Sequence, residues 1–220
     1  MRVAVISSVY GGYDEIAPPP PQDHAAEWVL VSDRDYDCPP WRVVTEPRPA
    51  CHPRLAAKYA KARPFDYADA DVAIWADGNM RLAAGDFVSW CLERLGAAGL
   101  AMTPHPMETT IAGEAGLARP LAKYAGQPLD EQVAHYAARG FPDGRAGHWW
   151  TGLIVRRRTC PDFGDAWLRE MLRFGYEDQI SLPYVFWRAG ITPREMPLDT
   201  ARYGWAPHNA EAPRGAACAS

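Results

Sequence analysis

The segment Asp71–Asn79 joins an apolar run to polar residues whose oxygens could bind a cation. Val72–Trp75 is continuously apolar, which predicts a buried strand of a parallel sheet. Asp77, Gly78 and Asn79 follow at once, and in open α/β sheets ligands bind beyond the carboxyl ends of the strands. Asp77 and Asn79 could therefore hold a hard divalent cation together with the phosphates that the ion neutralises. The alternative is an ordinary turn, because Asp-Gly and Gly-Asn are common turn dipeptides.

A basic helix is predicted just before this strand. Pro53 opens the segment Arg54–Arg63, in which Arg54, Lys58 and Lys61 share one face because they are spaced at i, i+4 and i+7. A diphosphate lying between this face and the acidic strand end would need such cations. A solvated basic surface is the alternative interpretation.

The N-terminus predicts a first buried strand over residues 2–9, followed by the loop Tyr10–Asp14. The loop lacks the GxGxxG pattern of dinucleotide-binding folds. Tyr10, Gly11 and Tyr13 could instead let a flat base approach the backbone and rest on an aromatic ring. A simple glycine-rich turn is equally compatible with these residues.

A second strand is predicted over residues 27–32, with Asp33 at its end, and a third over residues 41–45. If the strands are parallel, Asp33 lies at the same sheet edge as Asp77. There it could accept hydrogen bonds from a base or ribose, or it could act only as a cap or turn residue.

The second half of the chain predicts further strands over 99–103 and 149–156 and helices over 86–95, 129–139 and 163–174. Trp149 and Trp150 are either core residues or a platform for a sugar. His105 lies in a polar loop, where an isolated histidine is more often structural than catalytic. A last helix begins near Ile180, and Asp178 before it either caps the helix or binds a hydroxylated ligand.

Composition restricts the class of protein. The chain has 220 residues, 48% of them hydrophobic, a net charge of −4 and a pI near 5.9, which favours one α/β domain and argues against a nucleic-acid partner. No apolar run reaches the ~18 residues of a membrane span, so we expect a cytoplasmic protein. The five widely spaced cysteines predict reduced thiols, since no CxxC pair is present.

Taken together, these motifs resemble a glycosyltransferase-like family first catalogued as a domain of unknown function and later associated with plant mucilage and pectin biosynthesis. The resemblance extends roughly to Trp187 and follows the family's order of motifs. It rests on Val3–Asp14, Val29–Asp33, Arg54 with Lys58, Ile74–Asn79, Glu131-Gln132 with Tyr136 and Gly140, and Asp178–Leu182.

The resemblance implies a single GT-A-like domain over residues 1–210, with a Rossmann-like, mixed but mostly parallel sheet flanked by helices. Residues 1–100 would bind the nucleotide-sugar and residues 101–210 the acceptor, a glycan or lipid-linked hydroxyl group, while residues 211–220 form a flexible tail. The nucleobase and ribose would contact the loop from Tyr10 to Tyr13 and Asp33.

The diphosphate of the donor, with a UDP-sugar favoured, would contact Arg54 and Lys58. Asp77 and Asn79 stand where such enzymes carry an Asp-x-Asp metal motif, which identifies the cation as Mn²⁺ or Mg²⁺, and His208 resembles in position a histidine that some of them add to the metal. Asn79 departs from the motif, because a neutral amide supplies less charge than a carboxylate.

The activity predicted from this resemblance is metal-assisted transfer of a sugar from a nucleoside-diphosphate sugar in polysaccharide biosynthesis. If the sugar's configuration inverts, a carboxylate must take the acceptor's proton, and Asp178, Glu177 and Glu131 are the candidates. If it is retained, Asp178 and Gln179 would hold the sugar. The alternatives are a catalytically silent carbohydrate-binding protein and a sugar nucleotidyltransferase.

Overall fold

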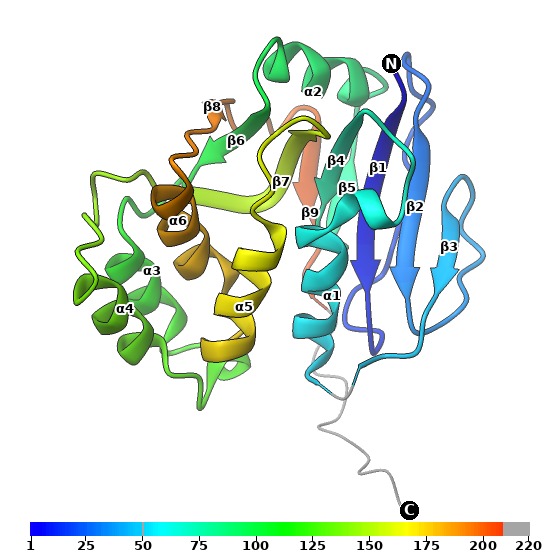
Figure 1. The fold of residues 1–220 in the computed structure, drawn as a ribbon. Coiled ribbons are helices and arrows are strands. Elements are labelled where there is room, and N and C mark those ends of the chain that lie inside the picture. Colours follow the sequence, from blue (N-terminus) through cyan, green and yellow to red (C-terminus); the bar gives the residue numbers. More distant parts are fainter. Residues whose placement is uncertain (50, 209–220) are drawn as a thin grey trace, which may run out of the picture.

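The computed structural model describes residues 1–49 and 51–208, which form a seven-stranded sheet flanked by helices (Figure 1). The strand order is β3-β2-β1-β4-β7-β6-β8. Neighbouring strands from β3 to β4 are parallel, β7 is antiparallel to both β4 and β6, and β8 is parallel to β6. The predicted fold class is confirmed: an α/β domain of GT-A-like type with a mixed, mostly parallel sheet.

The strands of this sheet are β1 (Val3–Val9), β2 (Glu27–Ser32), β3 (Arg42–Thr45), β4 (Val72–Ala76), β6 (Leu100–Pro104), β7 (Trp149–Arg157) and β8 (Arg194–Glu195), and a second sheet pairs β5 (Met80–Leu82) with β9 (Tyr203–Trp205). The helices are α1 (Pro53–Ala62), α2 (Phe87–Leu95), α3 (Ile111–Ala118), α4 (Leu129–Ala137), α5 (Gly164–Phe174) and α6 (Asp178–Ala189), with short 3₁₀ turns η1 (Pro64–Asp66) and η2 (Ala122–Tyr124).

One edge of the large sheet collects the polar residues. The carboxyl ends of β1, β2 and β4 meet there because these strands are parallel. The antiparallel strand β7 begins at the same edge, since Leu153 pairs with Ala76 and the N–H of Asp77 donates to the carbonyl of Gly152. Segments widely separated in the chain are thereby brought to one place.

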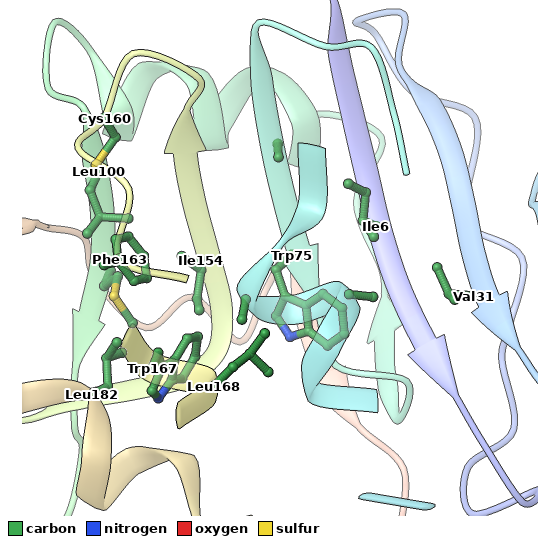
Figure 2. Close-up of a cluster of buried hydrophobic side chains, with 14 of the residues drawn as sticks. Ile6, Val31, Trp75, Leu100, Ile154, Cys160, Phe163, Trp167, Leu168 and Leu182 are labelled. Carbon is green, nitrogen blue, oxygen red and sulfur yellow. The ribbon is translucent and has the colours of Figure 1, made fainter. Parts of the chain in front are cut away.

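Alternating residues of the strands form two separate cores. Ile6, Val31 and Trp75 pack with residues of α1, α5 and α6 on one face, whereas Val5 and Ile74 pack with α2 on the other. Figure 2 shows the first of these cores, with labelled side chains from the sheet meeting labelled side chains of α5 and α6. Both faces of β1, β2 and β4 are buried, which explains their continuous apolar runs.

Several elements lie outside the sequence prediction. Helix α3 and the β5–β9 pair were not expected; α3 packs with α4 and α6 around a third core, and β9 returns the chain to the end of β4. Within the described residues, every helix is too short or too polar to cross a lipid bilayer. The tail predicted over 211–220 lies outside the described residues.

Trp167 offers a test of this packing. Its ring is fully buried, and its Nε1 donates to the carbonyl of Asp178 and to Ser181 Oγ at 3.2 and 3.0 Å. We expect Trp167→Ala to lower the free energy of unfolding by about 3–5 kcal/mol in urea titrations. Trp187→Ala, at a ring that is 36% exposed, is the control and should cost less than about 1 kcal/mol. Equal losses would contradict the assigned core.

Candidate active site

A cleft of about 230 Å³ opens at the carboxyl edge of the sheet. It lies between the loops after β1 and β4, helix α1, the turn η2, the start of β7 and the start of α6. The predicted site residues that line it are Tyr10, Tyr13, Arg54, Lys58, Asp77, Asn79, Asp178, Gln179 and His208. Residues from both halves of the chain that the sequence analysis assigned to one site therefore line the same cavity.

The ammonium group of Lys61 lies beneath the cleft and bonds residues that line it. Its side chain is fully buried, and Nζ lies 2.7 Å from Asp178 Oδ2, 3.2 Å from Asp77 Oδ1 and 3.1 Å from Thr151 Oγ1. Trp75 Nε1 also donates to Asp77 Oδ1, at 2.7 Å. A buried ammonium is costly unless all its hydrogens are bonded, and here three segments of the chain supply the three acceptors.

Asp178 is the most strongly compensated carboxylate of the cleft. Its Oδ2 lies 2.7 Å from both Lys58 Nζ and Lys61 Nζ, while Oδ1 accepts a hydrogen bond from Thr151 at 3.0 Å. Burial alone would raise its pKa, but the two ammonium groups hold the pKa of Asp178 well below its usual range. Asp178 is therefore an ionised structural partner and a poor proton acceptor.

Two further cations face the cleft without such compensation. Within the described ranges, neither Arg54 nor Lys123 forms an ion pair with a carboxylate; Arg54 lies 3.7 Å from the ring centre of Tyr13 and Lys123 lies 4.8 Å from that of Tyr124. Burial lowers the pKa of both, and for Lys123 the nearby positive charges of Arg54 and Lys58 lower it further. Unpaired cations converging on a cavity favour an anionic ligand.

Glu177 has the opposite electrostatic environment from Asp178. It lines the cleft although it is only 3% exposed, and burial, followed by the charges of Asp178 and Glu114, raises its pKa. Its side chain accepts from the N–H of Gln179 at 3.3 Å and caps α6. The cap that the sequence offered to Asp178 is thus made by the preceding residue.

The loop after β1 has the conformation that its glycines allow. Gly11 and Gly12 adopt φ angles of 67° and 65°, a left-handed region that other residues rarely occupy. Asp33 accepts from the N–H of Gly11 at 3.0 and 3.1 Å and, like Gly11, is not among the residues lining the cleft. Tyr10 is 3% exposed and contributes mainly to the core.

The three predicted metal ligands line one cavity but do not form a ready set of donors. Asp77 Oδ1 is engaged by Lys61 and Trp75, Asn79 donates its amide hydrogen to the carbonyl of Ala206 at 3.1 Å, and His208 Nδ1 lies 2.6 Å from Asp14 Oδ1. Among the described His, Cys, Asp and Glu residues, the group close enough to share an ion lies elsewhere in the fold. His208 is therefore held by Asp14, whereas Asp77 Oδ2 and Asn79 Oδ1 have no hydrogen-bond partner among the described residues.

Glu131, the third carboxylate proposed as a base, lies on the exposed side of α4 and outside the cleft. Its neighbour Gln132 is the buried residue, and it donates to Tyr136 Oη at 2.9 Å. The motif around residue 131 thus belongs to the third core rather than to the cavity.

Some cleft residues were not identified from the sequence. Lys123 and Tyr124 lie in a short turn without periodicity, and Thr151 follows two tryptophans that dominate its segment. Lys61 did carry a signal, because its spacing from Arg54 and Lys58 placed it on the same helical face. The sequence could not show that this face is buried at Lys61, near the carboxyl end of the helix.

Comparisons with known proteins agree with the architecture. The class that the structure shows is an α/β domain with a GT-A-like fold. Among solved structures, the chain is similar to the apo structure of WbbM, a bifunctional glycosyltransferase, with a TM-score of 0.52 and 14% sequence identity over 90% of this chain. The match covers 38% of that protein, so this chain corresponds to well under half of its length.

No family model matches the sequence, and no curated protein matches it. The resemblance to the mucilage- and pectin-associated family therefore stays a prediction from the motifs. The structural neighbour supports a glycosyltransferase-like fold and, at this level of identity, the fold alone.

The Lys61 contacts predict a specific dependence of stability on pH. The pKa of Asp178 is depressed in the folded protein, so its stabilisation is complete above its unfolded value of about 4 and is lost as the pH falls below that. We expect Lys61→Met to lower the free energy of unfolding by about 3 kcal/mol at pH 7, and to reduce the further loss of stability between neutral and acid pH. Denaturant titrations at several pH values measure both.

Lys123→Met is the matched control, since Lys123 forms no ion pair within the described residues. It should change the free energy of unfolding by less than about 1 kcal/mol. An unchanged stability in Lys61→Met would show that the buried contacts are not formed in solution.

Proposed function

We propose that this protein transfers a sugar from a nucleoside-diphosphate sugar to a hydroxyl acceptor. The observation that carries the proposal is the pair of uncompensated cations, Arg54 and Lys123, at the edge of the sheet where ligands of α/β folds bind. The protein's net charge is −4, so this positive cluster is opposite in sign to the charge of the protein as a whole. The glycosyltransferase architecture of the chain makes a sugar nucleotide the anion that fits best.

The cations would act on the leaving diphosphate. When the bond between the anomeric carbon and the diphosphate breaks, negative charge grows on the departing oxygen, and preorganised cations stabilise that charge more in the transition state than in the ground state. Arg54 and Lys123 are free to move onto the phosphates, whereas Lys58 is held 2.7 Å from Asp178. Lys61 is buried and would act only by fixing Asp77 and Asp178.

Glu177 is the carboxylate best suited to accept the acceptor's proton. A general base works best when its pKa lies near the operating pH, and Glu177 has a raised pKa whereas that of Asp178 is depressed. Of the three carboxylates considered from the sequence, Glu131 lies outside the cleft. Proton transfer to Glu177 would accompany attack of the hydroxyl oxygen on the anomeric carbon.

Metal assistance remains a prediction of the sequence. Mn²⁺ or Mg²⁺, when bound, would neutralise the phosphates, and Asp77 would be its carboxylate ligand through Oδ2, because Lys61 and Trp75 engage Oδ1. Because Arg54 and Lys123 already bring positive charge to the cleft without a carboxylate partner among the described residues, we assign the binding of the diphosphate to these two side chains.

Binding of UDP tests the assignment directly. We expect Arg54→Ala and Lys123→Ala each to weaken UDP binding at least about tenfold in calorimetric titrations, because each removes a charge-assisted contact to phosphate. Arg169→Ala, at an exposed position on α5, should leave the affinity unchanged. The titrations are run in EDTA and in Mn²⁺, and binding in EDTA is expected to persist.

Two results would count against this assignment. Absence of UDP and GDP binding under both conditions would favour the carbohydrate-binding alternative. Binding seen only with Mn²⁺ and lost in Asp77→Ala would restore the metal centre predicted from the sequence.

Glu177 can be tested by its effect on turnover. We expect Glu177→Gln to lower the rate of transfer about 100-fold while UDP affinity stays within about twofold of the wild type, since the base does not contact phosphate. The wild-type rate should fall as the pH drops below the raised pKa of Glu177, and this acid limb should be absent from the residual activity of the variant. A rate and pH profile unchanged by the substitution would exclude Glu177 as the base.

A further inference from the structure

A second polar cluster lies directly behind the cleft. His105 follows β6, Glu114 belongs to α3 and His148 precedes β7. Glu114 Oε2 lies 3.3 Å from His105 Nε2 and 3.5 Å from His148 Nε2, and all three side chains are at least nine-tenths buried. Such a group is expensive to bury, and the proposed chemistry does not use it.

The cluster is connected to the cleft through Gln179. The amide nitrogen of Gln179 donates to Glu114 Oε1 at 3.1 Å and to Glu177 Oε1 at 3.3 Å. Its amide oxygen lies 3.4 Å from the N–H of Thr151, at the start of β7. A primary amide has two hydrogens, and the two carboxylates accept both of them. The amide oxygen therefore points to the other side, toward Thr151.

The imidazole of His105 faces Glu114 as a donor. His105 Nδ1 accepts from the backbone N–H of Glu108 at 3.0 Å and from that of Met107 at 3.4 Å. The neutral ring therefore carries its proton on Nε2, the atom nearest to Glu114. Among the described residues these three are the set close enough to hold a metal ion, but a protonated Nε2 is a donor and not a ligand.

The two oxygens of Glu114 therefore face different groups. Its Oε2 faces the two imidazoles and has no hydrogen-bond partner, while its Oε1 accepts from Gln179. The protonated Nε2 of His105 lies 3.3 Å from this oxygen, whereas neither ring nitrogen of His148 has a hydrogen-bond partner among the described residues. A carboxylate accepts hydrogen bonds and, when ionised, cannot donate them, so Glu114 Oε1 leaves the amide of Gln179 with only one favourable orientation.

We propose that Glu114 is a positioning residue that makes Gln179 present its amide oxygen, and not its NH₂ group, to the sugar of the bound donor. The proposal rests on the proposed function, because it assigns the ligand that Gln179 meets. An amide oxygen accepts a hydrogen bond from a sugar hydroxyl and places partial negative charge near the anomeric carbon, where positive charge develops. With the amide reversed, its NH₂ group would still donate to a hydroxyl oxygen, but it would place partial positive charge near the anomeric carbon and oppose the charge that develops there.

A double-mutant cycle separates positioning from a structural role. The donor is found by measuring hydrolysis of UDP-glucose, UDP-galactose, UDP-N-acetylglucosamine and GDP-mannose, and turnover and KM are then measured for the wild type, Glu114→Ala, Gln179→Ala and the double variant. We expect Glu114→Ala to lower kcat about 10- to 100-fold, with KM within about threefold and UDP affinity unchanged.

In the Gln179→Ala background, loss of Glu114 should have no further effect on kcat, because its target is gone. Glu114→Gln should retain more activity than Glu114→Ala, since one amide oxygen can still accept from Gln179. Glu170→Ala is the control: Glu170 accepts from Tyr136 Oη at 2.9 Å on the far side of the third core and should leave kcat unchanged.

The outcomes are distinct. The positioning role would be overturned if the wild type is active and the decreases in kcat caused by Glu114→Ala and Gln179→Ala multiply in the double variant. It would also be overturned if Glu114→Ala lowers kcat no more than Glu170→Ala does. Stoichiometric Zn²⁺ in the purified protein, absent from His148→Ala, would overturn it in favour of a metal site. A wild type that binds no UDP or GDP and turns over none of the donors would overturn the proposed function, and this inference with it.

Discussion

The structure of the cleft depends on one buried cation. Lys61 lies under the cavity and joins Asp77 from the end of β4, Thr151 from β7 and Asp178 from the start of α6. Its ammonium group is also within 5.6 and 6.0 Å of the ring centres of Trp75 and Trp167. The geometry of three segments is thus set by a group that substrate does not reach, and the side chains around it are already oriented before a ligand binds.

The same arrangement divides the carboxylates by function. Asp178 is neutralised by Lys58 and Lys61, whereas among the described residues no ammonium group forms an ion pair with the adjacent Glu177, which is buried and has a raised pKa. Neighbours in sequence therefore differ in their affinity for protons, which is the usual way for one site to hold both a permanent charge and a proton acceptor. Lys58 is paired with Asp178, and the proposed function therefore assigns the anionic ligand to Arg54 and Lys123.

The sequence predicted the central strands well because β1, β2 and β4 are buried on both faces and consequently read as continuous apolar runs. It also predicted α1 and placed Asp33 and Asp77 at one edge, since parallel strands end at a common edge, whereas Asp178 was assigned to the site only by the family resemblance. It did not predict the partners of those side chains. Whether Asp77 meets a metal ion or a lysine depends on where helix α1 packs, and that is set by contacts distant in the chain.

Other features had no local signal. Glu114 and His148 are buried by the packing of α3 and β7, and neither lies in a motif that periodicity or spacing distinguishes. Lys123 lies in the turn η2, which is only three residues long. Asp33 was correctly placed at the end of β2, yet its carboxylate bonds the backbone of Gly11, a contact that depends on the left-handed conformation of that loop.

Strand β1 starts at Val3, close to the marked N-terminus, and crosses the sheet (Figure 1). It ends at Val9, which lines the cleft, and the N–H of Ala206 donates to the carbonyl of Asn79 beside the same cavity. Residues 1 and 208, the two ends of the described part of the chain, are therefore unequal places for attaching a purification tag or for fixing the protein to a surface. A tag at residue 1 stands at the opposite edge of the sheet from the cavity, whereas one joined after residue 208 starts at its mouth. Immobilisation for ligand-binding measurements should use the amino end.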